Sequence, residues 1–580
     1  MNEIKNTIRN FFWVYKPLNN KCKFALFLAL LMILIGAFIP SLIPKYIGSI
    51  IDNLIEDKNL AYTTIGFIAI LFLIDIVAEI SRRYLIEKTA TKEQKELTIK
   101  ASNWLIHLDI NWLNAQRSGG LNARIQRSVE GSVKLLKLAT MDFLPNILQM
   151  LFAVGVAFFT NIYIGLVLVC VILIGLVTVA QQIKSQKGIR LSLIRTREDN
   201  DSNIVELLAG IESVRLANEE KNQIERIESV NEILRVREMK HHIKMMFFDV
   251  IKKTNIVSWN LVILLIGVTL ASSSIITPGE VVIFNLLFNN VIMPIQSIHR
   301  FLDEAHESSL KTNDLRDILS LPLDISYNPK TENNKQINRE LAICTNSLYV
   351  DYDDKKVLEN INLDFEKGKY YGLIGTTGCG KSTLLKAIMR LTHPSSGSIS
   401  LFGKDINTIT RKELASMIVF MPQKPYIFSG SIKENLLFGC KYTPTDNDLW
   451  WALQQASISN EVKIMENGLD FHLNERGTNL SGGQCQRIAL TRVFLCLKNM
   501  QNEHIIILDE ATSALDIATE EKVINNLLSL VDKKTTIIAI AHRYNILKKS
   551  DYIINMDKDV TDRYIPYKEL VEQYNENKIL

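Results

Sequence analysis

The chain has 580 residues, of which 47% are hydrophobic and 22% charged, and this length exceeds a single compact module of about 150 residues. The 66 Lys and Arg residues nearly balance the 62 Asp and Glu residues, so a net charge of +4 gives no general electrostatic case for binding nucleic acid. The seven cysteines form neither a CxxC pair nor a cluster with histidines, which argues against a disulfide framework or a zinc site and fits reduced thiols in the cytosol.

Residues 1–23 are too polar and aromatic for a signal peptide, so we expect a cytoplasmic N-terminal or elbow segment. Six apolar segments follow, and each approaches the roughly 20 residues that a helix needs to cross the hydrocarbon core. Together they predict a transmembrane domain over residues 24–308. The segments lie near residues 24–44, 61–80, 142–160, 162–181, 255–273 and 279–298.

The connections between these segments differ in length and charge. Short turns poor in Lys and Arg join the third segment to the fourth and the fifth to the sixth, whereas long basic stretches follow the second and the fourth. By the positive-inside rule, the basic stretches and both termini face the cytoplasm. The sequence therefore predicts a multi-pass protein of the inner (plasma) membrane, surrounded by membrane lipids.

The stretch after the second segment predicts a long cytoplasmic helix. Residues 81–107 contain no Gly or Pro and have apolar positions at helical spacing. At 1.5 Å rise per residue, such a helix reaches roughly 40 Å beyond the bilayer. We expect the far ends of the two cytoplasmic excursions, near 109–116 and 206–218, to contact another domain.

Several polar residues lie within the predicted spans. Asp75 and Glu79 share one helix face and either line a cavity that attracts cations or, the favoured interpretation, pair with Arg82 or Arg83 near the cytoplasmic end. Asn285 and Asn289, one turn apart, either line a polar cavity or form hydrogen bonds between helices. The same two interpretations apply to Asn260, Gln296 and His299.

A polar, Asn-rich stretch over residues 309–340 predicts a linker, and residues 341–580 read as a second domain. Short β-rich runs there alternate with helical patterns, which indicates an α/β nucleotide-binding sheet. The predicted fold class is therefore an all-α membrane domain of six helices with long cytoplasmic extensions, followed by an α/β P-loop ATPase domain.

A phosphate-binding loop follows the strand predicted at residues 370–374 and leads into a helix. Its glycines let backbone amides surround the phosphates, Lys381 adds positive charge, and the Ser382 hydroxyl is suited to Mg²⁺. ATP or GTP is expected here. The loop residues are Gly375, Thr376, Thr377, Gly378, Cys379, Gly380, Lys381, Ser382 and Thr383.

Two acidic residues end a later apolar strand. Asp509 is placed to hold Mg²⁺ through water, and Glu510 to polarise the attacking water. His542 closes the next strand, where it would hydrogen-bond the γ-phosphate or the water held by Glu510. These three residues are candidates for catalysis of nucleotide hydrolysis.

The string Ser481, Gly482, Gly483 and Gln484, preceded by Leu480, lies about a hundred residues after the phosphate loop. With this signature and six spans ahead of one nucleotide-binding domain, nearly the whole chain resembles the ABC transporter superfamily, specifically an exporter-type half-transporter. The resemblance implies that the signature of one subunit completes the ATP site of the other. A homodimer enclosing two ATP molecules is therefore expected.

The resemblance also assigns roles to individual residues. Tyr352 lies where the family stacks adenine, Gln423 resembles the Q-loop residue, and Asp516 lies in a segment like the D-loop. Pro294 and the segment Glu475–Gly477 match a sixth-span proline and the X-loop. The implied cofactors are ATP and Mg²⁺, the latter bound by Ser382, Gln423 and Asp509. Cys379 replaces the usual Ser and is a candidate target for alkylation.

The function implied is ATP-driven export of an amphipathic peptide, lipid or drug-like substrate by alternating access in the dimer. Alternatives are a flippase for a lipid-linked molecule, one half of a heterodimeric exporter, and an ATP-gated regulatory membrane protein. A soluble ATPase acting on DNA or ribosomes is disfavoured by the six spans. No peptidase-like sequence precedes the first span, so leader cleavage by this chain is not expected.

Overall fold

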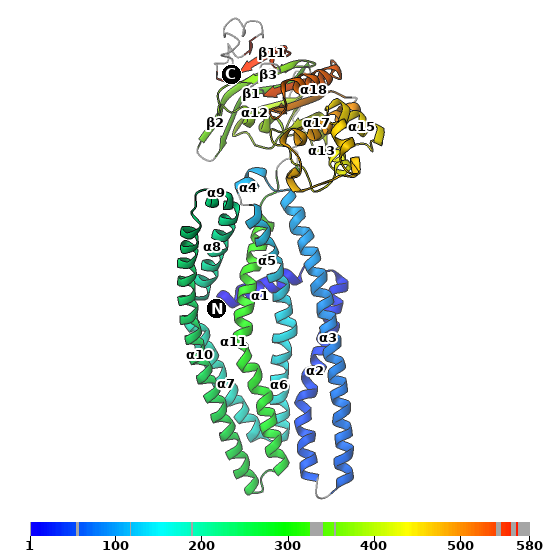
Figure 1. The fold of residues 1–580 in the computed structure, drawn as a ribbon. Helices are drawn as coiled ribbons and strands as arrows, with labels where there is room; N and C mark the ends of the chain where they lie inside the picture. The colour runs from blue at the N-terminus through cyan, green and yellow to red at the C-terminus, as the bar shows by residue number, and fades with distance from the viewer. Residues whose placement is uncertain are drawn as a thin grey trace. The chain divides into compact units, whose positions relative to one another are not determined.

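The computed structural model describes residues 2–53, 57–115, 118–186, 189–324, 327, 340–352, 355–500, 502–540, 547–557 and 564–565. The chain divides into two compact units (Figure 1). The first comprises Met1–Ile106 and Gln116–Leu321, and the second comprises His107–Ala115 and Pro322–Leu580. A short segment of the first half of the chain, His107–Ala115, is thus part of the second unit.

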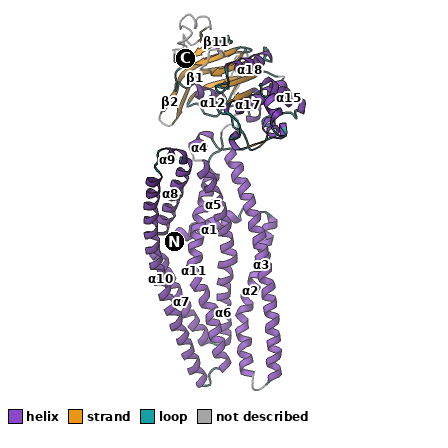
Figure 2. Ribbon diagram, in the orientation of Figure 1, coloured by secondary structure: helices purple, strands orange, loops and turns teal. Residues whose placement is uncertain are grey.

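The first unit is entirely helical in its described residues (Figure 2). Six of its helical stretches are long and apolar enough to cross a membrane, which confirms the six predicted spans. The helix of the second span continues without a break to Ile106, which confirms the predicted helical extension. The elements are α1 (Asn2–Tyr15), α2 (Asn20–Asn53), α3 (Lys58–Ile106), α5 (Ser118–Lys137), the π-helix η1 (Leu138–Phe143), α6 (Leu144–Thr160), α7 (Ile162–Gln186), α8 (Ile189–Ala209), α9 (Ile211–Leu216), α10 (Glu220–Ser272) and α11 (Pro278–Ser320).

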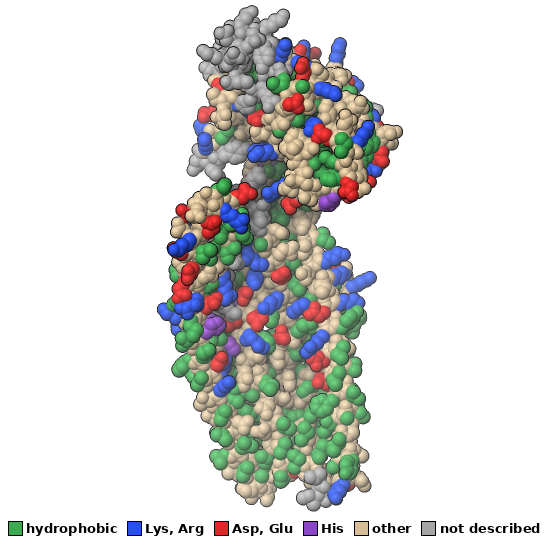
Figure 3. Space-filling view, in the orientation of Figure 1, with side chains coloured by type: hydrophobic (Ala, Val, Ile, Leu, Met, Phe, Trp, Pro, Cys, Tyr) green, Lys and Arg blue, Asp and Glu red, His purple; other side chains and the backbone are tan. Residues whose placement is uncertain are grey.

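Helix α11 forms the centre of this unit. Half of the most apolar stretch of α11 is buried, whereas 11% of the corresponding stretch is buried in α3 and in α10. Phe284, Leu287 and Phe288 of α11 are fully buried among side chains of α6 and α7. Hydrophobic side chains cover the outer surface of the spans (Figure 3), as expected for a surface in contact with lipid.

Helices α2 and α11 approach closely at one end. A Cβ atom on Gly279 would lie 2.3 Å from the Gly48 carbonyl oxygen, so only glycine fits this contact. Asp52 of α2 accepts hydrogen bonds from the Thr277 hydroxyl (2.7 Å) and the Gly279 amide (2.8 Å) at the start of α11. This packing of small residues with a polar cap fixes the two helices against each other.

Glu79 and Asn290 are two polar residues of the spans that form side-chain contacts. Glu79 pairs with Arg83 one turn later, as favoured from the sequence. Asn290 forms bonds between helices, donating to the Pro40 carbonyl (3.1 Å) and accepting from Gln149 (3.4 Å). Of the residues singled out, His299 lies 3.4 Å from the Lys252 ammonium, Asn285 is half-buried and Asn289 is exposed.

The predicted linker begins later than expected, because α11 continues to Ser320 and residues 309–320 are helical. This stretch is polar, but its small hydroxyl and apolar side chains recur at helical spacing and pack against other helices. Asn10 of α1, for example, donates to the Ser309 carbonyl (2.9 Å) and the Asn313 side chain (2.9 Å). Most of residues 325–339 lies outside the described part of the chain.

In its described residues the second unit combines helices with three sheets, the smallest of which is the two-stranded antiparallel sheet β7-β8. A six-stranded sheet has the order β12-β11-β3-β10-β9-β6, and a four-stranded antiparallel sheet has the order β2-β1-β4-β5. The strands are β1 (Leu341–Tyr352), β2 (Lys355–Glu366), β3 (Tyr370–Ile374), β4 (Ser396–Leu401), β5 (Lys404–Asp405), β6 (Ile418–Met421), β7 (Gly430–Ser431), β8 (His472–Leu473), β9 (His504–Asp509), β10 (Thr535–Ile540), β11 (Tyr552–Asn555) and β12 (Tyr564–Ile565). The helices are α4 (Ile110–Ala115), α12 (Lys381–Ile388), α13 (Arg411–Met417), α14 (Ile432–Leu437), α15 (Asp446–Gln455), α16 (Ser459–Ile464), α17 (Gly482–Lys498) and α18 (Ile517–Ser529).

Strands β11, β3, β10, β9 and β6 run parallel. Strand β10 is buried along its whole length, and β9 and β3 are buried except at their carboxyl ends. Burial on both faces explains their continuous apolar sequences. The carboxyl ends of parallel strands share one edge, so the loop after β3 and the acidic residues at the end of β9 meet there.

We predict that Gly279→Ala destabilises the membrane unit. The added methyl group would overlap the Gly48 carbonyl and force α2 and α11 apart, at a cost of roughly 1–3 kcal/mol. The matched control is Gly66→Ala on α3, where a Cβ atom meets nothing within 4 Å. Thermal unfolding in detergent should show a lower midpoint for Gly279→Ala only. Equal midpoints for the two variants would contradict the proposed contact.

Candidate functional site

The phosphate-binding loop joins β3 to α12. Gly375, Gly378 and Gly380 have φ values of 145°, 92° and 98°, a region that favours glycine. The loop therefore curls so that the N-terminus of α12, with its unpaired backbone N–H groups, opens into it. This arrangement confirms the strand, loop and helix expected around Lys381 and presents positive partial charge to an anion.

The Lys381 ammonium group lies inside this loop. The residue is 8% exposed, and its Nζ donates hydrogen bonds to the carbonyl oxygens of Gly375 (2.6 Å) and Thr376 (3.0 Å). Cys379 Sγ lies 3.8 Å from the same Nζ. Ser382, on the first turn of α12, is exposed, and Thr383 beside it is half-buried.

The end of β9 brings the predicted acidic pair to the same edge of the sheet. Asp509 is the last residue of the strand, and Glu510 follows with a φ of 46°, an uncommon backbone conformation for a non-glycine residue. Gln423 Nε2 donates to Glu510 Oε2 at 2.5 Å. Strained backbone at an acidic residue is typical of functional sites, and here it fixes the direction of the Glu510 carboxylate.

The donor atoms near this edge fit Mg²⁺. Ser382 offers a hydroxyl oxygen, Asp509 a carboxylate, and Gln423 an amide oxygen, because its Nε2 is already bonded to Glu510. Mg²⁺ prefers an all-oxygen set of this kind, completed by phosphate oxygens and water. The residues present therefore fit the predicted cation.

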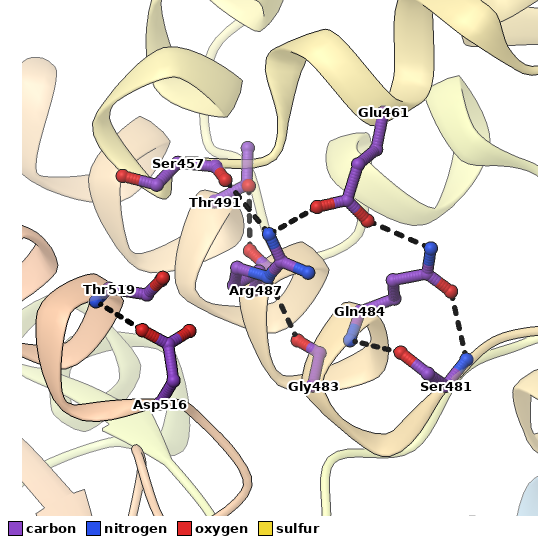
Figure 4. A network of polar contacts seen from close by, with 9 residues as sticks. All are labelled: Ser457, Glu461, Ser481, Gly483, Gln484, Arg487, Thr491, Asp516 and Thr519. Carbon is purple, nitrogen blue, oxygen red and sulfur yellow. Dashed lines mark hydrogen bonds and ion pairs between the residues drawn. The ribbon is translucent and has the colours of Figure 1, made fainter.

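The signature turn forms the N-terminus of α17 (Figure 4). Ser481 Oγ accepts from the Gln484 amide (3.2 Å), and Gln484 Oε1 accepts from the Ser481 amide (2.8 Å). Gln484 Nε2 also donates to Glu461 (2.8 Å). The Gln484 side chain thus rigidifies the turn, while Ser481 and Gly482 are exposed at the helix N-terminus.

A salt bridge joins α17 to α16. Arg487 pairs with Glu461 and donates to the carbonyl oxygens of Ser457 (2.9 Å) and Gly483 (3.3 Å), as Figure 4 shows. Asp516 caps α18 by accepting from the Thr519 amide (2.9 Å), and hydrogen bonds from the Thr519 side chain and amide lower the pKa of its carboxyl group. Asp516 therefore carries a negative charge at the start of α18.

The side chains of two predicted site residues lie outside the described part of the chain. Tyr352 is the last residue of β1, and its side chain lies outside the described part of the chain. His542 also lies outside the described residues. Their assigned roles stay predictions that follow from the resemblance.

Two residues near the site were missed from the sequence. Gln486 is buried and joins three motifs: it donates to the Ser513 hydroxyl (3.0 Å) and the Gln423 carbonyl (3.5 Å) and accepts from the Ala514 amide (3.0 Å). The one feature of the sequence that could have identified Gln486 is its position two residues after the signature. Asp557, just after β11, accepts from the Thr376 amide (2.6 Å) and hydroxyl (2.8 Å). Nothing local in the sequence marks Asp557, because its partner is 181 residues away.

Two family models match the chain. The model described as "ABC transporter" matches residues 358–513. The "ABC transporter transmembrane region" model matches residues 26–295. Together they cover most of the chain, in the order expected from the sequence.

The curated relatives include bacterial transport proteins. The mesentericin-Y105 transport/processing ATP-binding protein MesD of Leuconostoc mesenteroides is 32% identical over 61% of this chain and 48% of its own length. The lactococcin transport/processing ATP-binding protein LcnC-like of Lactococcus lactis subsp. lactis is 28% identical over 90% of this chain and 72% of its own. The uncharacterized ABC transporter ATP-binding protein YwjA of Bacillus subtilis is 26% identical over 97% of this chain and 96% of its own length.

A solved structure has the same fold. A bacterial Atm1-family ABC exporter with ATP bound matches with a TM-score of 0.82 over 94% of this chain and 96% of that chain. The two are 19% identical in sequence, so this match establishes the fold. The predicted fold class is thereby confirmed.

We predict that a maleimide blocks nucleotide hydrolysis through Cys379 and that ATP protects the thiol, because an adduct in the phosphate-binding loop would obstruct the phosphates. Burial raises the pKa of Cys344 and Cys440 to about 11 and raises those of Cys485 and Cys496, so these thiols should react slowly. Mass spectrometry should locate the adduct, and a Cys379→Ser variant should keep its turnover. Full turnover after confirmed labelling of Cys379 would refute the prediction.

Proposed function

The chain belongs to the ABC transporter family and has the fold of an exporter half-transporter, and from this premise we propose that it is an ATP-driven exporter of amphipathic substrates. The observation that carries the proposal is the joining, in one chain, of six apolar spans to a phosphate-binding loop and a signature turn. An ATPase acting on a soluble target has no use for the spans. We further propose that the chain lies in the inner membrane with both termini in the cytoplasm.

The residues of the loop would bind and orient ATP. Lys381 would exchange its bonds to loop carbonyls for phosphate oxygens, since a charge-assisted bond to an anion is stronger than one to a neutral carbonyl. The N-terminus of α12 would face the phosphates and favour their negative charge. Tyr352 would stack on adenine, as the family resemblance implies.

The residues at the end of β9 would carry out hydrolysis. Glu510 would act as general base on the attacking water, with its carboxylate held in place by Gln423. Ser382, Gln423 and Asp509 would hold Mg²⁺, which when bound neutralises charge on the phosphates. His542 would orient the water or the γ-phosphate.

A second copy of this chain would complete each site. The turn at Ser481 and Gly482 presents a helix N-terminus, exposed amides and a hydroxyl, which suit the γ-phosphate of an ATP bound to another subunit. The network of Gln484, Glu461 and Arg487 keeps this turn rigid before the partner arrives. Such preorganisation lowers the entropic cost of closing the dimer.

Movement would pass to the membrane through two short helices. Helix α4 belongs to the nucleotide-binding unit and follows α3 of the membrane unit in the chain after the non-helical residues 107–109. Helix α9 ends in Leu216, which is 89% exposed, and its neighbours Glu212 and Ser213 are also exposed. An exposed leucine at a helix end is suited to a pocket on another surface, in agreement with the predicted contact near 206–218.

Peptides are the substrate class best supported among those considered. The relatives from Leuconostoc and Lactococcus are named for transport and processing of mesentericin and lactococcin. Lipid and drug-like substrates, a flippase role and a heterodimer are the alternatives. Each candidate substrate can be tested for stimulation of the ATPase activity of the protein in liposomes and for uptake into inverted vesicles. The true substrate class should give both effects. Flux that persists without continuous hydrolysis would instead favour an ATP-gated protein.

We predict that complementary variants identify the shared site. A dimer pairing a Lys381→Ala chain with a Gly482→Asp chain retains one intact composite site, whereas a doubly substituted chain paired with wild type retains none. Gly482→Asp is tolerated by the fold because a Cβ atom there meets only Ala514 Cβ at 3.8 Å and acids are favoured at helix N-termini. Each mixed dimer is purified through different tags on its two chains. The dimer of two singly substituted chains should hydrolyse ATP, and the dimer of the doubly substituted chain with wild type should not.

The opposite ranking would overturn the composite site, because a chain that closes its own site would stay active beside a doubly substituted partner. Purified wild-type chain alone should hydrolyse ATP. A requirement for a different chain would instead favour the heterodimer.

We predict that Glu510→Gln binds ATP but loses about 10²–10⁴-fold in turnover, since it removes the general base while keeping shape and the contact with Gln423. The variant should accumulate as a closed dimer with trapped ATP. Steady-state ATPase activity and nucleotide retention measure the two effects. Retained hydrolysis would remove Glu510 from the role of base.

A further inference from the structure

A cluster of one imidazole and two carboxylates joins three separate parts of the second unit. We call it the His–Asp cluster: His393 lies in the turn between α12 and β4, Asp109 directly precedes α4, and Asp324 follows α11. His393 Nε2 lies 3.6 Å from Asp324 Oδ1 and 3.7 Å from Asp109 Oδ2. Ligand atoms of all three residues lie within 4.8 Å of one another.

The spacing of these atoms matches a shared ligand sphere. Both nitrogen-to-oxygen distances exceed the roughly 3.2 Å of an ordinary N–H···O hydrogen bond. Two atoms each about 2.1 Å from a tetrahedral Zn²⁺ ion lie about 3.4 Å apart. The two distances from His393 Nε2, 3.6 and 3.7 Å, are close to this separation, and all three ligand atoms lie within 4.8 Å of one another, so side-chain movements would bring them into coordination.

The local structure holds the carboxylates in place. Asp109 Oδ1 accepts from the amides of Asn111 (2.8 Å) and Trp112 (3.1 Å) at the start of α4, and its Oδ2 is the atom nearer His393. Asp324 is 6% exposed, and its amide donates to the His107 carbonyl at 2.8 Å. Ligands fixed in this way lose little entropy on binding.

The charges favour a cation. A metal-bound imidazole is neutral, so the two carboxylates would then carry the charge of the cluster, and the buried Arg390 guanidinium, attracted to Asp324, offsets one of the two negative charges. Arg390 Nη1 donates to the Ile406 and Ile409 carbonyls, which keeps the guanidinium anchored. One net negative charge remains to attract a dication.

We propose that Asp109, Asp324 and His393 bind a divalent transition-metal ion, for which Zn²⁺ is the best match. One nitrogen and two carboxylate ligands suit Zn²⁺, whereas Mg²⁺ prefers oxygen ligands only. The side chains of His393 and Asp109 are 27% and 32% exposed, so water has access as a fourth ligand. The bound ion would tie α4 to the turn after α12, and its binding does not depend on the transport proposal.

The experiment is a calorimetric titration of the full chain with Zn²⁺ in detergent. The protein is stripped with chelator, purified through a tag without histidine, and kept free of nucleotide at pH 8 with excess Mg²⁺, so that oxygen-only sites are filled. We expect one Zn²⁺ per chain whose binding weakens at least about tenfold in His393→Ala. Co²⁺ as a probe should give a visible absorption band that the same variant loses.

Two further variants separate ligation from folding. Asp109→Asn keeps a side chain that caps α4 but removes the charge, and it should also weaken Zn²⁺ binding. His472→Ala changes an exposed histidine elsewhere in the unit and should bind Zn²⁺ like wild type. Unchanged Zn²⁺ binding in both His393→Ala and Asp109→Asn would overturn the proposal and leave the cluster an ion pair only.

Discussion

The buried ammonium group of Lys381 needs an anionic partner, and the phosphate-binding loop of the nucleotide-binding unit is built around this need. A buried cation is costly unless it is paired, and the two carbonyl oxygens that accept its hydrogen bonds carry only partial charge. A bound triphosphate would supply the missing negative charge. The glycines with left-handed φ, the N-terminus of α12 and the contact of Asp557 with Thr376 all serve to keep the loop curled around this group.

What the sequence could predict was local in the chain. The six spans follow from apolar length, and the phosphate-binding loop follows from glycine spacing between a strand and a helix, so both were found without tertiary information. The family models confirm the same two regions. The linker start was wrong because the polar end of α11, around Ser309 and Thr312, is buried by packing that a composition argument does not register.

What the sequence could not predict depends on contacts between distant residues. Asp557 meets Thr376 only because β11 and β3 are neighbours in the sheet. The His–Asp cluster combines residues from the start of α4, the end of α11 and the turn after α12, and no Cys or His spacing marks it. Folding alone brings these three side chains together, so the spacing of Cys and His in the sequence does not reveal them.

The position of α4 in the chain bears on how ATP hydrolysis would reach the membrane. Helix α3 runs unbroken from Lys58 to Ile106, and α4 begins four residues later as part of the nucleotide-binding unit. A helix transmits an axial displacement along its length because its hydrogen bonds resist compression, whereas a flexible loop absorbs it. Asp109 holds the start of α4 near His393 within the nucleotide-binding unit, and under the proposed coupling such a contact would stiffen the path into the second span. The same contact that completes the His–Asp cluster lies on this path, so a cation bound there would act on coupling without touching the ATP site.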